Sequence, residues 1–237
     1  MQSLTRIFVA LLLVVGITFG GFYSNANAAV VSGNLSIQGT LSNAIVESPP
    51  SVGGGVIRIN GSNDSFVSFG TKIGQFGTND FTVAFWLQTT EKYRYFDLAG
   101  NRTAGSHGNF LAIRQTGKHE SIPEGIVSAE VDQDQNGTNY IGIQSQAKGL
   151  NDGNWHHIVV GRKGTSLKLY VDGVLSGCGS GKGVANINNG NPFKLGRSLV
   201  GVSDKFAADA RYYEFRVYDF ALNDDEVLSL FYSAGLR

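Results

Sequence analysis

Cysteine is almost absent from this sequence, because Cys178 is the only one among 237 residues. A single cysteine cannot form a disulfide within the chain, so the fold must rest on its hydrophobic core. Cys178 lies in GVLSGCGSGKG, a stretch rich in glycine and serine that we interpret as a loop. We expect a loop thiol with no special role, and an intermolecular disulfide is the alternative.

A net charge of one sign is also lacking, since 19 Lys and Arg side chains balance 19 Asp and Glu side chains. Nucleic-acid binders normally carry a basic surplus, so no nucleic-acid partner is expected. The sequence contains no phosphate-binding loop, dinucleotide fingerprint, Cys/His zinc spacing or Gly-x-Ser-x-Gly motif. It therefore carries none of these signatures of cofactor-dependent or serine-nucleophile enzymes.

Long hydrophobic runs are missing beyond Phe22, so we expect no membrane span in the mature chain. The beginning of the sequence differs. Arg6 precedes an apolar run, and a small-residue Ala-x-Ala pattern follows at 26–28, an order typical of a signal peptide. We predict that residues 1–28 are cleaved off after Ala28 and that the protein is secreted, to the extracellular space or the periplasm. A membrane anchor is the alternative.

Glycine and β-forming residues are abundant. Segments rich in Val, Ile, Phe and Tyr are bounded by Gly, Asn or Asp, as expected for strands joined by turns. One short strand is predicted near 35–37, within an N-terminal strand and loop segment at 29–55. From residue 56 onwards the predicted strands are VIRIN, SFVSFG, FTVAFWLQT, YRYFDLA, FLAIRQ, GIVSAEV, NYIGIQS, WHHIVVGRK, SLKLYVDG, FKLGRS and ARYYEFRVYDF.

The turns and a single helix complete the pattern. Asp172-Gly173 and Asn136-Gly137 are dipeptides typical of β-hairpin turns. Asn223, with Glu226 three residues later, has the capping-box spacing that begins a helix. Many antiparallel strands and one short C-terminal helix predict an all-β fold, a two-sheet antiparallel jelly-roll sandwich, as one domain over residues 56–237.

Three segments resemble the laminin-G-like jelly-roll domains of the concanavalin A-like lectin/glucanase superfamily. NDFTVAFWLQT at 79–89 is similar to the family's Phe-Thr-x-x-x-Trp strand, and DGNWHHIVVGRKGTSLKLYVDGVL at 152–175 to its Asp-Gly-x-Trp-His-His-Val strand and hairpin. Residues 194–231 resemble its closing strand and helix, although Tyr212-Tyr213-Glu214 replaces the usual Ile-Asp-Glu. The resemblance implies the fold. It does not decide function, because this fold hosts lectins, adhesion modules and enzymes.

Two tryptophans and two adjacent histidines lie in the matched strands. We expect Trp86 and Trp155 to anchor the core between the two sheets, since each can bury a large ring. His156 and His157 point to opposite faces of their strand. We therefore interpret the histidines as structural residues and not as a metal-binding or catalytic pair.

Glu130, Asp132 and Asp134 alternate along a predicted strand, which would place them on one face. Laminarinase-type glycoside hydrolases of the resembled superfamily carry Glu-x-Asp-x-Glu there, and retaining glycosidases need two carboxyls about 5 Å apart. Here the third position is an aspartate that is expected to fall in a hairpin turn. We do not expect an enzyme, and a hydrolase using Glu130 and Asp134 is the first alternative.

Asp132, Asp134 and Asn136, followed by Gly137, have the oxygen-ligand spacing of a calcium loop. The closing glutamate of an EF-hand is missing. We predict calcium as the cofactor, with these three residues as its metal ligands, and an ordinary polar hairpin turn is the alternative. Three other acidic residues are further candidates for a calcium site: Asp64, Asp204 and Asp209.

A carbohydrate site needs aromatic rings that stack on sugars, with amides and charged groups nearby. Tyr93 and Tyr95 share one face of a predicted strand, with Asn101 and Arg102 at its end. We predict these four as ligand-binding residues; rings that merely cover a sheet are the alternative. The preferred function is a secreted, non-catalytic module whose rim loops bind glycan or a surface or matrix protein. A structural or adhesion protein with a protein partner is the second alternative.

Overall fold

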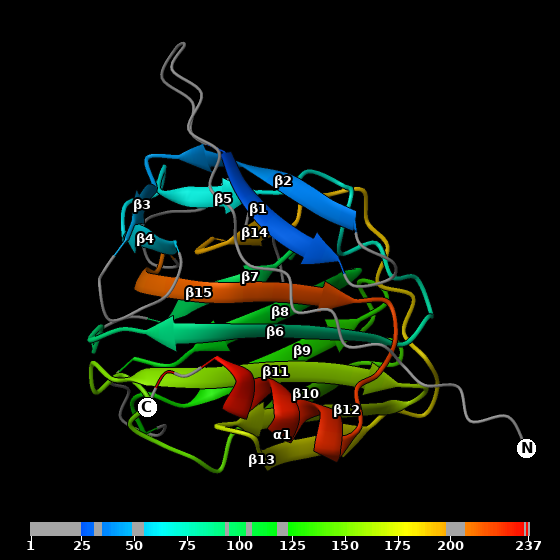
Figure 1. Ribbon diagram of the computed structural model, residues 1–237. Helices are drawn as coiled ribbons and strands as arrows, with labels where there is room; N and C mark the ends of the chain where they lie inside the picture. The colour runs from blue at the N-terminus through cyan, green and yellow to red at the C-terminus, as the bar shows by residue number, and fades with distance from the viewer. Residues whose placement is uncertain are drawn as a thin grey trace, which may run out of the picture.

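The computed structural model describes residues 25–30, 35–48, 55–92, 95–102, 106–117, 123–197, 207–234 and 236 (Figure 1). The strands in these ranges are β1 (Asn25–Val30), β2 (Leu35–Ser42), β3 (Ile45–Glu47), β4 (Val56–Asn60), β5 (Phe66–Ser68), β6 (Phe81–Gln88), β7 (Phe96–Gly100), β8 (Phe110–Gln115), β9 (Val127–Asp132), β10 (Ile141–Gln144), β11 (Trp155–Lys163), β12 (Ser166–Val171), β13 (Val174–Ser180), β14 (Lys194–Leu195) and β15 (Asp209–Tyr218). One helix, α1 (Asp224–Ser233), follows the last strand.

The strands form a continuous hydrogen-bonded path that folds into two layers. The path runs β10-β9-β8-β7-β14-β5-β2-β1-β15-β6-β11-β12-β13, and β4 pairs with β15. Every pair is antiparallel except β1 with β15. In Figure 1, β15, β6 and β11 lie in front of β7, β8 and β9, and α1 lies across the front layer. The predicted two-sheet antiparallel jelly-roll sandwich is confirmed.

Alternation along β6 explains how the layers are held. Phe81, Val83, Phe85 and Leu87 face the core between the two sheets. The residues between them face outward, where Ala84 joins a second apolar cluster beneath α1. Both faces of this strand are therefore covered, which accounts for its nearly continuous apolar sequence. Within the described ranges, no helix is long and apolar enough to span a bilayer.

Trp86 does not lie in the core between the sheets, contrary to the prediction. It occupies an outward position on β6, in a cluster with Val56, Tyr213 and Leu236. Its indole stacks on Phe231 of α1, with ring centroids 5.5 Å apart. Trp155 is only half-buried and packs against the edge of the same cluster. Trp86 therefore attaches α1 to the front sheet, because strand parity places its ring on the outer face.

Cys178 lies in a strand, and the loop predicted around it is wrong. The segment forms β13, which pairs with β12 and leaves the thiol exposed. Gly177 lies against the backbone carbonyl of Gln144, so a side chain there would collide with β10. The glycines that suggested a loop instead let β13 approach β10 at the open edge of the sandwich.

The predicted cleavage point after Ala28 falls inside β1. Residues 1–24 of the predicted signal peptide lie outside the described residues, and Asn25–Val30 pairs with β2 and β15. Cleavage after Ala28 would leave Ala29 and Val30 as the only residues of this strand. The signal peptide stays a prediction.

The helix begins as the sequence predicts. Asn223 Oδ1 accepts from the Glu226 amide at 2.9 Å, and Glu226 Oε2 accepts from the Asn223 amide at 2.8 Å. This capping box satisfies two amide groups that the first helical turn leaves without partners. Val227 and Leu230 then face the front sheet.

Asn223→Ala is expected to lower the free energy of unfolding by about 1 kcal/mol, because it removes the capping oxygen. For a chain of this size the thermal midpoint should fall by about 2–4 °C. Thermal unfolding followed by circular dichroism measures the change. Asn223→Asp keeps an acceptor and should match the wild type. Equal midpoints for the alanine variant and the wild type would show that the cap contributes nothing.

Candidate functional site

A row of paired charges crosses the outer face of the rear sheet. Arg114 on β8 contacts Asp97 on β7 at 3.0 Å and Glu130 on β9 at 3.6 Å. Arg102, just beyond β7, donates to the other oxygen of Glu130 at 2.9 Å. We call these four residues the charged row. They are brought together by the antiparallel register, in which Asp97 lies opposite Arg114 and Glu130 lies opposite Ala112.

Arg102 is held in place by more than one contact. Its guanidinium lies over the Phe110 ring, 4.1 Å from the centroid, and donates to the Ser106 carbonyl at 3.3 Å. Burial is the main cause that lowers the pKa of Arg102 from its usual value, while Glu130 raises it. The side chain therefore presents a fixed, largely buried positive charge at the edge of the sheet.

His107 and Tyr140 complete this region. His107 Nδ1 lies 2.7 Å from Asp132 Oδ2, and its ring meets the Tyr140 ring edge-on, with centroids 5.5 Å apart. The imidazole also rests on Gly137, where any side chain would collide with it. The Tyr140 hydroxyl covers Gly142, which pairs with Glu130 across β9 and β10. Because neither glycine has a side chain, each ring can lie close to the backbone beneath it.

We call Tyr140, His107, Arg102 and Glu130 the Tyr140 platform. Tyr140 is 42% exposed, which is unusual among the large rings that the structure describes. Its pKa is raised, chiefly by partial burial and next by the charge of Glu130. The phenol is therefore neutral at physiological pH and offers an open aromatic edge beside a fixed ion pair. Rings flanked by planar charged groups suit polar ligands with one apolar face.

The structure describes three of the four predicted ligand-binding residues, and they lie in different surroundings. Asn101 is buried, and its amide group joins the Gly74 carbonyl at 3.1 Å to the Leu111 amide at 2.9 Å, so it holds loops together. Tyr95 is half-buried, and Tyr93 lies outside the described residues. Of the four, Arg102 alone is placed by the described structure in the Tyr140 platform. Binding by any of the four stays a prediction.

The three carboxylates of the hydrolase alternative do not form an acid and nucleophile pair. Glu130 is bound by two arginines. Asp132 ends β9 fully buried, where it accepts from the Gly108 amide at 3.3 Å and the Gln133 amide at 2.8 Å. Asp134 lies beyond the strand, in the turn, as its position in the sequence predicts.

Hydrogen bonds that the Asp134 side chain accepts close the turn after β9. Asp134 Oδ1 accepts from the amides of Asn136 at 2.9 Å and Thr138 at 3.1 Å. Hydrogen bonds from Thr138 are the main cause that lowers the pKa of Asp134. No group of three His, Cys, Asp or Glu side chains that could hold a metal ion occurs among the described residues. Calcium at Asp132, Asp134 and Asn136 gains no support from this geometry and stays a prediction.

Comparison of the sequence with known families identifies its superfamily. A profile described as "Concanavalin A-like lectin/glucanases superfamily", of the laminin-G type, matches residues 60–228. The chain belongs to this superfamily. The match covers the charged row, the Tyr140 platform and the start of α1. A search of curated proteins found no match for the sequence.

In fold, the chain is similar to toxin binding domains whose structures are solved. The binding domain of Paraclostridial Mosquitocidal Protein 1 is 20% identical, with a TM-score of 0.65, covering 93% of this chain and 51% of that one. The Botulinum neurotoxin serotype G binding domain is 16% identical, with a TM-score of 0.59, covering 86% and 49%. The serotype C1 binding domain is 14% identical, with a TM-score of 0.61, covering 89% and 49%. The chain thus spans about half the length of these neighbours.

No motif in the sequence points to His107 or Tyr140 as site residues. His107 stands alone among loop residues, Tyr140 lies near the start of a predicted strand, and the two are 33 positions apart in the chain. The alternation in NYIGIQS does place Tyr140 on the face opposite Ile141 and Ile143, which the core takes. Its exposure depends on which loops cover that face, and a superfamily member can vary these loops freely.

Proposed function

We propose that this chain is a non-catalytic carbohydrate-binding module and that the Tyr140 platform is its ligand site. The observation that carries the proposal is the exposed Tyr140 ring set against His107 and bordered by the Arg102–Glu130 ion pair. A sugar ring has an apolar face for the phenol and hydroxyls for charged groups. Structural neighbours that are toxin binding domains support a binding role.

The same ion pairs speak against the hydrolase alternative. A retaining glycosidase needs two carboxyl groups about 5 Å apart, one as nucleophile and one as proton donor. Glu130 instead shares its oxygens between Arg102 and Arg114, and Asp132 is bound to His107. Neither side chain is free to reach a glycosidic oxygen in this arrangement. We therefore propose a module that binds without catalysis.

Secretion and calcium dependence are further parts of the proposal. The Arg6 and Ala-x-Ala pattern supports export, after which an extracellular or periplasmic glycan would be accessible. Calcium would have to compete with the backbone amides that Asp134 already caps. Binding measured in calcium and then in EDTA tests this dependence directly.

Tyr140→Ala is expected to weaken glycan binding at least tenfold, because it removes the stacking ring. A tenfold loss corresponds to about 1.4 kcal/mol. The wild-type chain is first applied to a glycan array, and the affinity for the best glycan is then measured by titration calorimetry. Tyr140→Phe keeps the ring and should retain most of the affinity.

Tyr232→Ala is the matched control, since Tyr232 is 54% exposed on α1, on the opposite outer face of the sandwich. It should bind glycan like the wild type. Equal affinities for the Tyr140→Ala and wild-type proteins would remove Tyr140 from the site. An array on which no glycan binds the wild type would overturn the carbohydrate proposal and favour a protein partner.

A further inference from the structure

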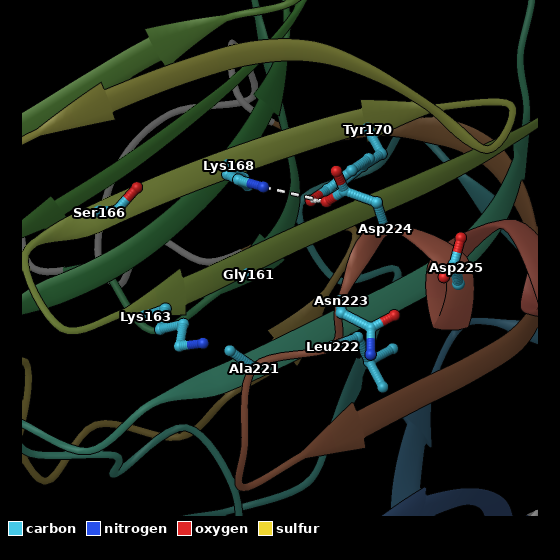
Figure 2. A pocket seen from close by; sticks show the side chains of 10 residues that line it. All are labelled: Gly161, Lys163, Ser166, Lys168, Tyr170, Ala221, Leu222, Asn223, Asp224 and Asp225. Atoms are coloured by element: carbon cyan, nitrogen blue, oxygen red, sulfur yellow. Dashed lines mark hydrogen bonds and ion pairs between the residues drawn. The ribbon is translucent and has the colours of Figure 1, made fainter.

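A cavity lies on the outer face of the front sheet, where α1 begins. It has a volume of about 540 Å³, within the range typical of small-molecule sites. Figure 2 shows Lys163 and Ala221 at one end and Asp224 and Asp225 at the other, with Gly161 between them. None of the sequence-predicted site residues lies in it, and we call it the α1 pocket.

The register of the β11–β12 hairpin shapes the floor of the α1 pocket. Gly161 lies opposite Lys168, and Lys163 lies opposite Ser166. Alternation turns these four positions to the outer face, while Leu167 and Leu169 enter the core. Because Gly161 has no side chain, a notch remains between the two lysines. A Cβ added there would come no closer than 3.4 Å to Thr82 Oγ1, so the notch has room for a larger group.

One wall of the α1 pocket consists of side chains that bind one another. Lys168 Nζ and the Tyr170 hydroxyl both reach Asp224 Oδ1, at 2.9 and 2.6 Å. These contacts lower the pKa of Asp224 and raise that of Lys168, so both are charged at physiological pH and neutralise each other. The triad forms a rigid polar edge.

The other polar groups that line the α1 pocket remain available to a ligand. Within the part of the chain that the structure describes, the side chains of Lys163, Ser166 and Asp225 make no hydrogen bond or ion pair. Asn223 uses its Oδ1 for the helix cap and keeps its side-chain NH₂ available. The pocket thus offers donors at Lys163 and Asn223, an acceptor at Asp225, and a hydroxyl that does both.

We propose that the α1 pocket is a second ligand site and that it binds a neutral saccharide unit. Two lysines and two aspartates give the lining no formal net charge. A simple anion would meet Asp225, and a simple cation would meet Lys163. Sugar hydroxyls both donate and accept, so they match the mixed groups, while Leu222 and Ala221 provide apolar contact for the ring. The inference shares its ligand class with the proposed function but lies at a different site.

The experiment uses the full chain and NMR titrations with methyl glycosides of glucose, galactose, mannose and N-acetylglucosamine. We expect at least one glycoside to shift the amide signals of Gly161, Ser166 and Asp225 with a millimolar dissociation constant. Gly161→Val should abolish these shifts, because it fills the notch with a residue that suits a strand. Lys163→Ala should weaken binding, whereas Lys72→Ala, on an exposed loop, should not.

Tyr140→Ala separates this proposal from the first one, since it should leave the α1 pocket shifts unchanged. If Tyr140→Ala loses glycan binding while no glycoside shifts the pocket amides, the second site is wrong and the Tyr140 platform stands. A folded Gly161→Val protein that binds like the wild type would also overturn it. So would shifts produced only by sodium sulfate or only by glycine, which would mark an anion or a zwitterion site.

Discussion

Lowering the pH from 7 to 4.5 is expected to reduce the free energy of unfolding, because His157 resists protonation in the folded chain. Its ring is buried, with centroids 5.1 Å from Trp86 and 6.2 Å from Phe231. Burial, followed by the charge of Arg216, lowers the pKa of His157 to about 4, and Asp172 acts in the opposite direction.

The sign of the effect follows from the order in which the two states bind a proton. In an unfolded chain the pKa of a histidine is about 6.5, so the unfolded state is protonated first as the pH falls. The contribution of the neutral His157 ring is fully present above that value and is lost as the pH approaches 4. The difference between the two pKa values corresponds to roughly 3 kcal/mol. Urea unfolding at several pH values measures the loss.

His156 provides the opposing case on the same strand. Its hydrogen bond to Asp172, at 2.9 Å, is the largest of the causes that raise its pKa, and burial acts against them. Its contribution is present below pH 6.5 and is lost as the pH rises through the raised pKa. His156→Gln should therefore steepen the fall in stability towards acid pH, whereas His157→Met should flatten it. A wild-type stability that is constant from pH 7 to 4.5 would contradict this account.

The strand pattern could be predicted because each strand carries its own signal. Alternation and turn residues located β4 and β11 at their observed bounds, and the capping box located the start of α1. The motifs at 79–89 and 152–175 then identified the superfamily. These features depend on residues that are close together in the sequence, where periodicity and turn chemistry act.

Features that depend on which elements pack together were harder to foresee. Trp86 lies in a different cluster from the one predicted, because the residues around it do not reveal that α1 covers the outer face of β6. The glycines of β13 are typical of a loop in the sequence, whereas Gly177 allows a close approach to β10. The Tyr140 platform joins residues from two connections and from strand β9, and only the register of β8, β9 and β10 brings them together.

Arg162 carries a buried charge in the interior of the sandwich. On β11 it shares the inward face with Val160, and its side chain is fully buried. The guanidinium donates to the carbonyls of Gly77 at 2.8 Å, Asn79 at 3.1 Å and Ala185 at 2.8 Å. Burial lowers its pKa to about 10, so it remains charged at physiological pH. One side chain therefore ties two loops together at one end of the sandwich.

Arg162→Met is expected to lower the free energy of unfolding by about 3–5 kcal/mol, since hydrogen bonds from a charged donor contribute about 1.5–3 kcal/mol each. Methionine fills part of the volume but leaves carbonyls without a donor. Arg162→Lys keeps the charge but lacks the planar guanidinium. Its free energy of unfolding should therefore lie between those of the wild type and Arg162→Met. Arg211→Met is the control, because its side chain is 43% exposed and should matter by less than about 1 kcal/mol. If urea unfolding gives the two methionine variants equal midpoints, the loops at 77–79 and 185 are held by other contacts, and Arg162 serves another purpose.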